Sequence, residues 1–155
     1  MTKAICFDMD GTIADLYNVP NWLEKLRDEN PEPYIVAKPM WDMEHLGSVL
    51  RKLQKQGWQV RVISWLAKDS SESYKEAVRA AKRWWLEHYD FPLDGCHLVE
   101  YGTTKANCVR KYWDSAPMIL IDDNEKVRHG WNLGDAINPL EVDIIQYLEK
   151  LVERD

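Results

Sequence analysis

A chain of 155 residues is long enough for one domain with one hydrophobic core. Hydrophobic residues make up 45% of the sequence and recur at regular spacing, which excludes a disordered chain. The formal net charge of −6 argues against extended nucleic-acid binding, because a broad grip on duplex nucleic acid needs a basic surface.

The cysteines and the N-terminal residues bear on the compartment. Cys6, Cys96 and Cys108 show no CxxC spacing, so we expect reduced thiols. The sequence enters an apolar strand directly after Met1-Thr2-Lys3 and shows no signal-peptide segment. No apolar run approaches the length of a membrane span. These features predict a cytoplasmic protein.

The first predicted elements are a buried strand and an irregular segment. Ala4–Phe7 is a short apolar run, typical of a buried strand, and the sequence DMDGT follows it at 8–12. Residues 17–41 are punctuated by prolines and contain a brief charged helix around 22–28. We interpret 17–41 as a small cap-like insertion within a single domain that spans residues 1–155.

The middle of the chain predicts a helix, a strand and a second helix. Asp42 is typical of a helix N-cap, and Gly57 is typical of the residue that follows a helix. The β-branched run 59–63 predicts a strand that ends at Ser64. A long helix is predicted from Ser71 to His88.

The second half of the chain continues the alternation. The predicted elements are a weak strand at 97–100, a helix from 103 or 104 to about 113, a buried strand at 118–121, a helix at 125–129, a strand at 135–137 and a final helix capped by Asn138. Strands that alternate with helices predict an α/β fold. We expect a three-layer, Rossmann-like arrangement, with a mainly parallel sheet and helices on both faces.

Polar side chains follow the predicted strands at the points where the strands end. They are Asp8 and Asp10, Ser64, Asp122 and Asp123, with Lys105 near the start of a helix. Ligands bind at the carboxyl ends of parallel strands, so we expect these groups to share one crevice. Each also has an ordinary structural interpretation: Asp10-Gly11 is a common turn dipeptide, and a helix lysine is usually solvated. Their combination is what indicates chemistry.

This combination suits phosphoryl transfer. Carboxylates are hard ligands for Mg²⁺, and a dication allows neighbouring carboxylates to stay ionised. A carboxylate can attack a phosphoryl group, while a lysine and the metal offset the charge on its oxygens. Gly11 permits a tight turn, which would direct backbone N–H groups at a phosphate.

The motifs also resemble a known family. DMDGT at 8–12 is similar to the first motif of the haloacid dehalogenase-like (HAD) superfamily, Ser64 to the second, Lys105 to the third, and LIDD at 120–123 to the fourth. The motifs occur in the family's order and span most of the chain. An acid at position 10 resembles the phosphatases and phosphomutases of the family, since the leaving oxygen of a phosphate ester needs a proton.

The resemblance implies a role for each matched residue. Asp8 is the nucleophile that forms an aspartyl-phosphate, and Asp10 is the acid and base that also helps hold the metal through its backbone carbonyl. Ser64, Lys105, Gly11 and Thr12 bind the phosphate; Asp8, Asp10 and Asp122 hold Mg²⁺; and Asp123 supports Lys105 or a metal-bound water.

The substrate is expected to be small, phosphorylated and of nucleotide type. The short insertion and the LIDD sequence are most similar to 5'(3')-deoxyribonucleotidases and to the phosphatase domain of polynucleotide kinases. Stacking on a nucleobase is one interpretation of Trp22, Trp41, Trp65 and Trp131, and core packing is the other. Two alternatives stay open: a 3'-phosphatase that processes polynucleotide ends, and a non-catalytic binding module with the same fold.

Overall fold

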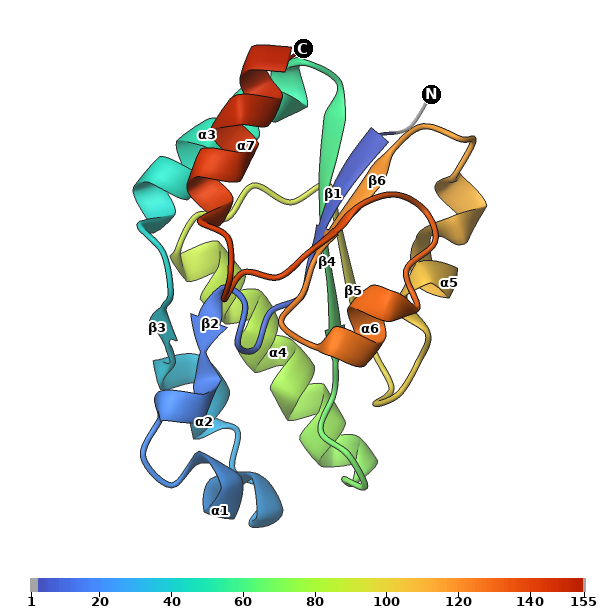
Figure 1. Cartoon of the computed structure of the whole chain (residues 1–155). Coiled ribbons are helices and arrows are strands. Elements are labelled where there is room, and N and C mark those ends of the chain that lie inside the picture. Colours follow the sequence, from blue (N-terminus) through green and yellow to red (C-terminus); the bar gives the residue numbers. More distant parts are fainter. Residues whose placement is uncertain (1–2, 155) are drawn as a thin grey trace.

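A five-stranded parallel sheet forms the centre of the molecule (Figure 1). The structure is a computed structural model and describes residues 3–154. The strand order is β5-β4-β1-β6-β7, where the strands are β1 (Lys3–Phe7), β4 (Trp58–Trp65), β5 (Gly95–Val99), β6 (Met118–Ile121) and β7 (Ala136–Ile137). The predicted α/β class is confirmed. Because β1 is central, the residues that follow it lie at the middle of the sheet's carboxyl edge.

Helices cover both faces of the sheet, as predicted. Ile5 and Phe7 pack on one face, against buried residues of α3 (Met43–Lys55), α4 (Glu72–His88) and α7 (Ile144–Arg154). Ala4 and Cys6 point to the other face, which is covered by α5 (Lys105–Val109), α6 (Glu125–His129) and Trp131. This alternation follows from the two-residue period of a strand.

Several predicted boundaries differ from those observed, among them that of β5, predicted at 97–100 and observed at Gly95–Val99. β4 continues two residues past Ile63, because Ser64 and Trp65 pair with β5. Ser64 therefore lies inside the strand rather than just after it. The helix predicted to reach residue 113 is instead the short α5, followed by a 3-10 turn, η2 (Arg110–Tyr112).

The predicted start of the last helix is wrong. The side chain of Asn138 accepts a hydrogen bond from the amide of Leu140 and closes a turn there. α7 begins six residues after Asn138, at Ile144, and the carboxylate of Asp143 accepts hydrogen bonds from the amides of Ile145 and Gln146. In an Asx turn and in a helix N-cap alike, the side chain of Asn accepts a hydrogen bond from a nearby backbone amide. The sequence around Asn138 is therefore compatible with either structure.

The insertion is a small subdomain closed by a two-stranded sheet. β2 (Ala14–Asp15) pairs antiparallel with β3 (Lys38–Pro39), and between them lie η1 (Leu16–Asn18), α1 (Trp22–Arg27) and α2 (Glu32–Val36). The helix α2 was not predicted, because prolines in this segment suggest a loop. Both prolines, however, stand in the first turn, where a missing N–H costs nothing.

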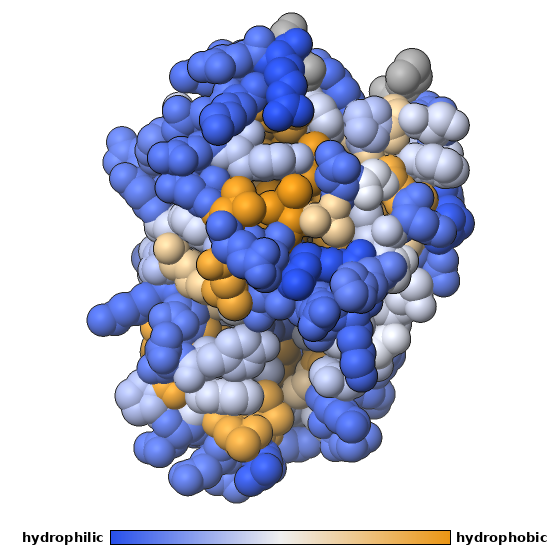
Figure 2. Space-filling model, in the orientation of Figure 1, coloured by the Kyte–Doolittle hydropathy of each residue, from blue (hydrophilic) through white to orange (hydrophobic). Residues whose placement is uncertain are grey.

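The insertion lies at the carboxyl end of the sheet, below the strands in Figure 1. It carries exposed apolar side chains, among them Leu23 and Ile35. Figure 2 shows hydrophobic residues at this lower end and in a second patch above the middle of the same face, with hydrophilic residues around both. Within residues 3–154, no helix is long and apolar enough to cross a membrane, and all three cysteines are free thiols.

Candidate active site

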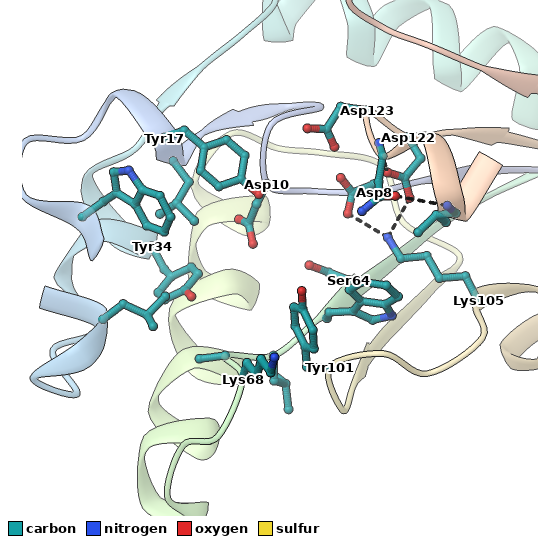
Figure 3. Close-up of a pocket in the computed structure, with 18 of the residues that line it drawn as sticks. Asp8, Asp10, Tyr17, Tyr34, Ser64, Lys68, Tyr101, Lys105, Asp122 and Asp123 are labelled. Atoms are coloured by element: carbon teal, nitrogen blue, oxygen red, sulfur yellow. Dashed lines mark hydrogen bonds and ion pairs between the residues drawn. The ribbon is translucent and has the colours of Figure 1, made fainter. Parts of the chain in front are cut away.

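A pocket of about 340 Å³ lies between the carboxyl edge of the sheet and the insertion (Figure 3). Its charged lining comes from loops and helix starts that follow β1, β4, β5 and β6. Six of the residues predicted from the sequence to act here line the pocket: Asp8, Asp10, Ser64, Lys105, Asp122 and Asp123. The parallel sheet thus brings together side chains that are up to 115 residues apart in the chain.

Three carboxylates form a compact group beside this pocket. One oxygen each from Asp8, Asp122 and Asp123 lies within 4.8 Å of the other two. The hydroxyl of Thr12 ties the group together: it is 3.0 Å from an oxygen of Asp8, and it accepts a hydrogen bond from the amide of Asp123 at 3.3 Å. β1 and β6 are adjacent, which places the two loops side by side.

Lys105 neutralises part of this negative charge. Its ammonium donates to Asp8 Oδ1 and to Asp122 Oδ2, both at 2.8 Å. The side chain is 3% exposed, so the two charge-assisted bonds are sheltered from water. The charges of both aspartates raise the pKa of Lys105, although burial acts against this. Lys105 is held by Asp8 and Asp122, whereas Asp123 interacts with Thr12.

Burial makes the remaining negative charge costly. It raises the pKa of Asp122 to about 6 and that of Asp123 to about 7, and in both cases the charge of Asp8 adds to the shift. Three close oxygen donors with excess negative charge fit a hard divalent cation such as Mg²⁺. The side chain of Asp10 is not part of this group, and its metal contact through the backbone carbonyl stays a prediction.

Asp10 instead pairs with a lysine that the sequence analysis did not single out. Lys82, in α4, donates to Asp10 Oδ2 at 2.9 Å and to the hydroxyl of Ser64 at 2.7 Å. Burial and the charge of Asp8 raise the pKa of Asp10, against the effect of Lys82. The available signal was a lysine on the apolar face of α4, between Val78 and Leu86 at helical spacing.

The phosphate contact expected of Gly11 and Thr12 stays a prediction, and the structure shows other contacts for both residues. Neither lines the pocket, and their amides donate to the carbonyls of Ala14 and Met9. Gly11 has φ +80°, and a Cβ there would lie 2.4 Å from an oxygen of Asp123. These two residues shape the loop that carries the carboxylates.

The tryptophans divide into two groups. Trp22 and Trp65 line the pocket. Trp41 donates its indole N–H to the carbonyl of Thr12, and Trp131 packs in the core and donates to the carbonyl of Met118. Stacking on a ligand is therefore open to only two of the four residues considered for it.

Comparison with known proteins bears on the fold. No protein-family model matches the sequence, and no curated protein matches it significantly. Among solved structures, a chain of the Pnkp1/Rnl/Hen1 RNA repair complex superimposes with a TM-score of 0.57 at 17% identity, over 89% of this chain. The match spans only 42% of that larger chain.

Two further structures match over most of both chains. D,D-heptose 1,7-bisphosphate phosphatase from Burkholderia thailandensis has a TM-score of 0.50 at 16% identity, over 86% of this chain and 75% of that one. A protein described as a HAD-like phosphatase, from Mesorhizobium loti, has a TM-score of 0.55 at 11% identity, over 97% and 87%. The chain has the HAD-like fold. In this HAD-like fold, the site described above occupies the crevice at the carboxyl edge of the sheet.

Proposed function

We propose that this protein is a phosphomonoester hydrolase that works through an aspartyl-phosphate. The observation that carries the proposal is the group of three carboxylates, two of them bridged by Lys105, at the wall of a pocket that also presents Asp10 and Ser64. The fold shared with phosphatases supports it. We also propose that residues 1–155 act as one domain, with 17–41 as its cap.

The reaction has two displacement steps at phosphorus. A carboxylate oxygen of Asp8 attacks, the new Asp8–phosphorus bond forms, and the bond from phosphorus to the ester oxygen breaks while Asp10 gives that oxygen a proton. A water then attacks phosphorus, Asp10 takes a proton from it, and the bond to Asp8 breaks. The products are an alcohol and inorganic phosphate, and both aspartates return to their first state.

The charges around the pocket support a metal requirement. Four aspartates face two buried lysines, Lys82 and Lys105, and the exposed Lys68, so one negative charge remains when all the aspartates are ionised. Asp8, Asp122 and Asp123 would hold Mg²⁺, which would offset this charge and that of the phosphoryl oxygens. Lys105, which lies beside Asp8 and Asp122, and Ser64 also line the pocket and would contact those oxygens.

A nucleotide-type substrate is favoured by the aromatic walls of the pocket. The insertion contributes Tyr17 and Trp22, whose rings are 5.1 Å apart, and the sheet edge contributes Trp65 and Tyr101, at 5.0 Å. Figure 3 shows Tyr17 and Tyr101 on different sides of the pocket. A planar base fits such walls, because stacking requires only a flat apolar face.

A polynucleotide end is the second candidate. The observation in its favour is a smaller cavity, of about 180 Å³, that shares Trp65 and Lys105 with the main pocket and extends along Gly102 and Lys126. The fold match to a chain of an RNA repair complex adds to it. The net charge of −6 stands against it, since contact with several phosphates needs basic residues.

A substrate panel tests the proposal. Phosphate release is measured for nucleoside monophosphates, sugar phosphates and a 3'-phosphorylated oligonucleotide, with Mg²⁺ and with EDTA. We expect Mg²⁺-dependent release and the highest kcat/KM for a mononucleotide. A higher value for the oligonucleotide that falls steeply with salt would favour end processing. No release from any substrate would favour a non-catalytic binding module.

A further inference from the structure

The side chain of Lys82 is 0% exposed and forms an ion pair with Asp10. Among residues 3–154, no other lysine in an ion pair is buried as completely. Lys82 lies on α4, one turn from Val78 and Leu86, and the ring of Tyr34 from the insertion covers it, with 5.2 Å between the ring centroid and Nζ. Burial of a charged amine is costly unless every donor is satisfied. Its partners are therefore informative.

The three protons of the Lys82 ammonium have three acceptors. These are Asp10 Oδ2 at 2.9 Å, Ser64 Oγ at 2.7 Å and the backbone carbonyl of Trp65 at 2.8 Å. An ammonium group has no further donor and no acceptor. Lys82 itself is thus fully used by the protein and does not line the pocket, whereas Asp10 and Ser64 both do.

These bonds constrain what Asp10 and Ser64 can do. The oxygen of Ser64 accepts from Lys82, so its own O–H proton is directed elsewhere and is available to an acceptor in the pocket. For Asp10, Lys82 occupies Oδ2, which leaves Oδ1 as the oxygen that can carry a proton. Figure 3 shows Asp10 and Ser64 facing the same pocket.

We propose that Lys82 is a positioning residue that fixes Asp10 and Ser64 in one relative orientation, so that the proton donor and the phosphate-binding hydroxyl address the same phosphoryl group. This inference rests on the proposed phosphatase function. Lys82 acts through its two partners and does not touch the substrate. Its cover by Tyr34 also links the insertion to this arrangement.

The alternative is that Lys82 is only a buried ion pair that stabilises the fold. The two roles differ in how catalysis depends on the leaving group. Loss of a positioned acid slows the release of a poor leaving group, such as an alkoxide, far more than that of nitrophenolate, which needs no proton. Loss of stability alone lowers both rates by the same factor.

The test compares wild-type protein with Lys82→Met, which keeps much of the side-chain volume and removes the charge. We expect kcat/KM, which reports the steps up to formation of the aspartyl-phosphate and not its hydrolysis, to fall at least about 100-fold for glycerol phosphate and about tenfold or less for p-nitrophenyl phosphate, given the usual contribution of a general acid. The matched control is Arg83→Met, a change at the exposed neighbouring residue of the same helix, which should leave both values unchanged.

A double-mutant cycle with Asp10→Asn tests whether the loss of activity in Lys82→Met occurs through Asp10. If Lys82 acts through Asp10, adding Lys82→Met to Asp10→Asn leaves the ratio of the two kcat/KM values nearly unchanged. Circular dichroism and thermal unfolding check that each variant folds. If Lys82→Met does not fold, Lys82→Gln, which keeps N–H donors without the charge, takes its place in the same cycle.

The outcomes separate this inference from the function on which it rests. A wild-type protein that hydrolyses neither substrate overturns both. A folded Lys82 variant that lowers kcat/KM for both substrates by one common factor overturns the positioning role and leaves the phosphatase intact. A selective loss for glycerol phosphate that disappears in the Asp10→Asn background supports the inference.

Discussion

The ammonium group of Lys105, at the start of α5, lies 2.8 Å from the carboxylate of Asp8, which directly follows the central strand β1. The two residues are 97 positions apart in the chain. Their contact is nearly closed to water and joins one face of the sheet to its carboxyl edge. Lys105 therefore contributes to stability and to the electrostatics of the site at once.

Replacement of Lys105 by methionine should affect both properties. Removal of one partner leaves Asp8 and Asp122 buried without compensation, which typically costs about 3–5 kcal/mol. We expect this loss in urea unfolding of the metal-free protein at pH 8, together with at least a 100-fold loss of kcat/KM. Lys150→Met, at an exposed position of α7, is the control. Equal unfolding midpoints for the two variants would contradict the role assigned to Lys105.

Metal-free protein should become less stable as the pH rises from about 4 to 8. The pKa values of Asp122 and Asp123 are raised to about 6 and about 7, so the folded state keeps protons that the unfolded state has already released. Proton loss then disfavours the folded state. Mg²⁺ should oppose this trend and should bind more tightly at higher pH.

Thermal unfolding in EDTA and in Mg²⁺, at pH 5 and pH 8, measures both effects. Asp123→Asn should weaken the pH dependence in EDTA, because the amide does not titrate. A stability gain on addition of Mg²⁺ that is as large at pH 5 as at pH 8 would show that these carboxylates are not the metal's ligands.

Gly11 should not tolerate a side chain. Its φ of +80° disfavours any L-residue, and a Cβ would also lie 2.4 Å from Asp123 Oδ2 and 2.7 Å from Tyr17. Gly102 has a similar φ of +87° but open space around it, so its replacement measures the cost of the backbone conformation alone. We expect Gly102→Ala to cost about 1 kcal/mol and Gly11→Ala clearly more in urea unfolding. Equal costs would mean that the contacts of Gly11 do not matter.

The aromatic wall should set affinity for a nucleobase and not the chemical step. Tyr101, packed against Trp65, is 53% exposed and can be replaced with little structural cost. Tyr101→Ala should raise KM for a nucleoside monophosphate about tenfold, since stacking contributes about 1–3 kcal/mol. KM for glycerol phosphate should stay the same. Trp84→Ala, at an exposed ring on α4 that stacks on His88, is the control.

The sequence predicts the α/β class and the carboxyl-edge crevice because both depend on local patterns. Apolar runs such as Met118–Ile121 mark buried strands, and the residues after them reach one edge once the sheet is parallel. Lys82 could not be assigned from its neighbours, because its partners Asp10 and Ser64 lie 72 and 18 residues away. The helix α2 was missed because prolines signal loops except in a first turn.

The roles of Gly11 and Thr12 show a second limit. A glycine after two aspartates is compatible with a phosphate-binding loop, and only the fold shows that its amide is already bonded to Ala14. Likewise, nothing in the local sequence shows that the Thr12 hydroxyl is used between Asp8 and Asp123. Hydrogen-bond partners across the site depend on tertiary structure, which local patterns do not encode.

Asp8 is the proposed nucleophile, and its replacement by asparagine tests the covalent mechanism. Turnover of p-nitrophenyl phosphate in Mg²⁺ is compared for wild-type protein, Asp8→Asn and the control Asp90→Asn, a change at a highly exposed aspartate. We predict that Asp8→Asn folds but loses turnover, since a neutral amide does not attack phosphorus, and that Asp90→Asn keeps the wild-type rate. Near wild-type turnover by Asp8→Asn would contradict the covalent mechanism.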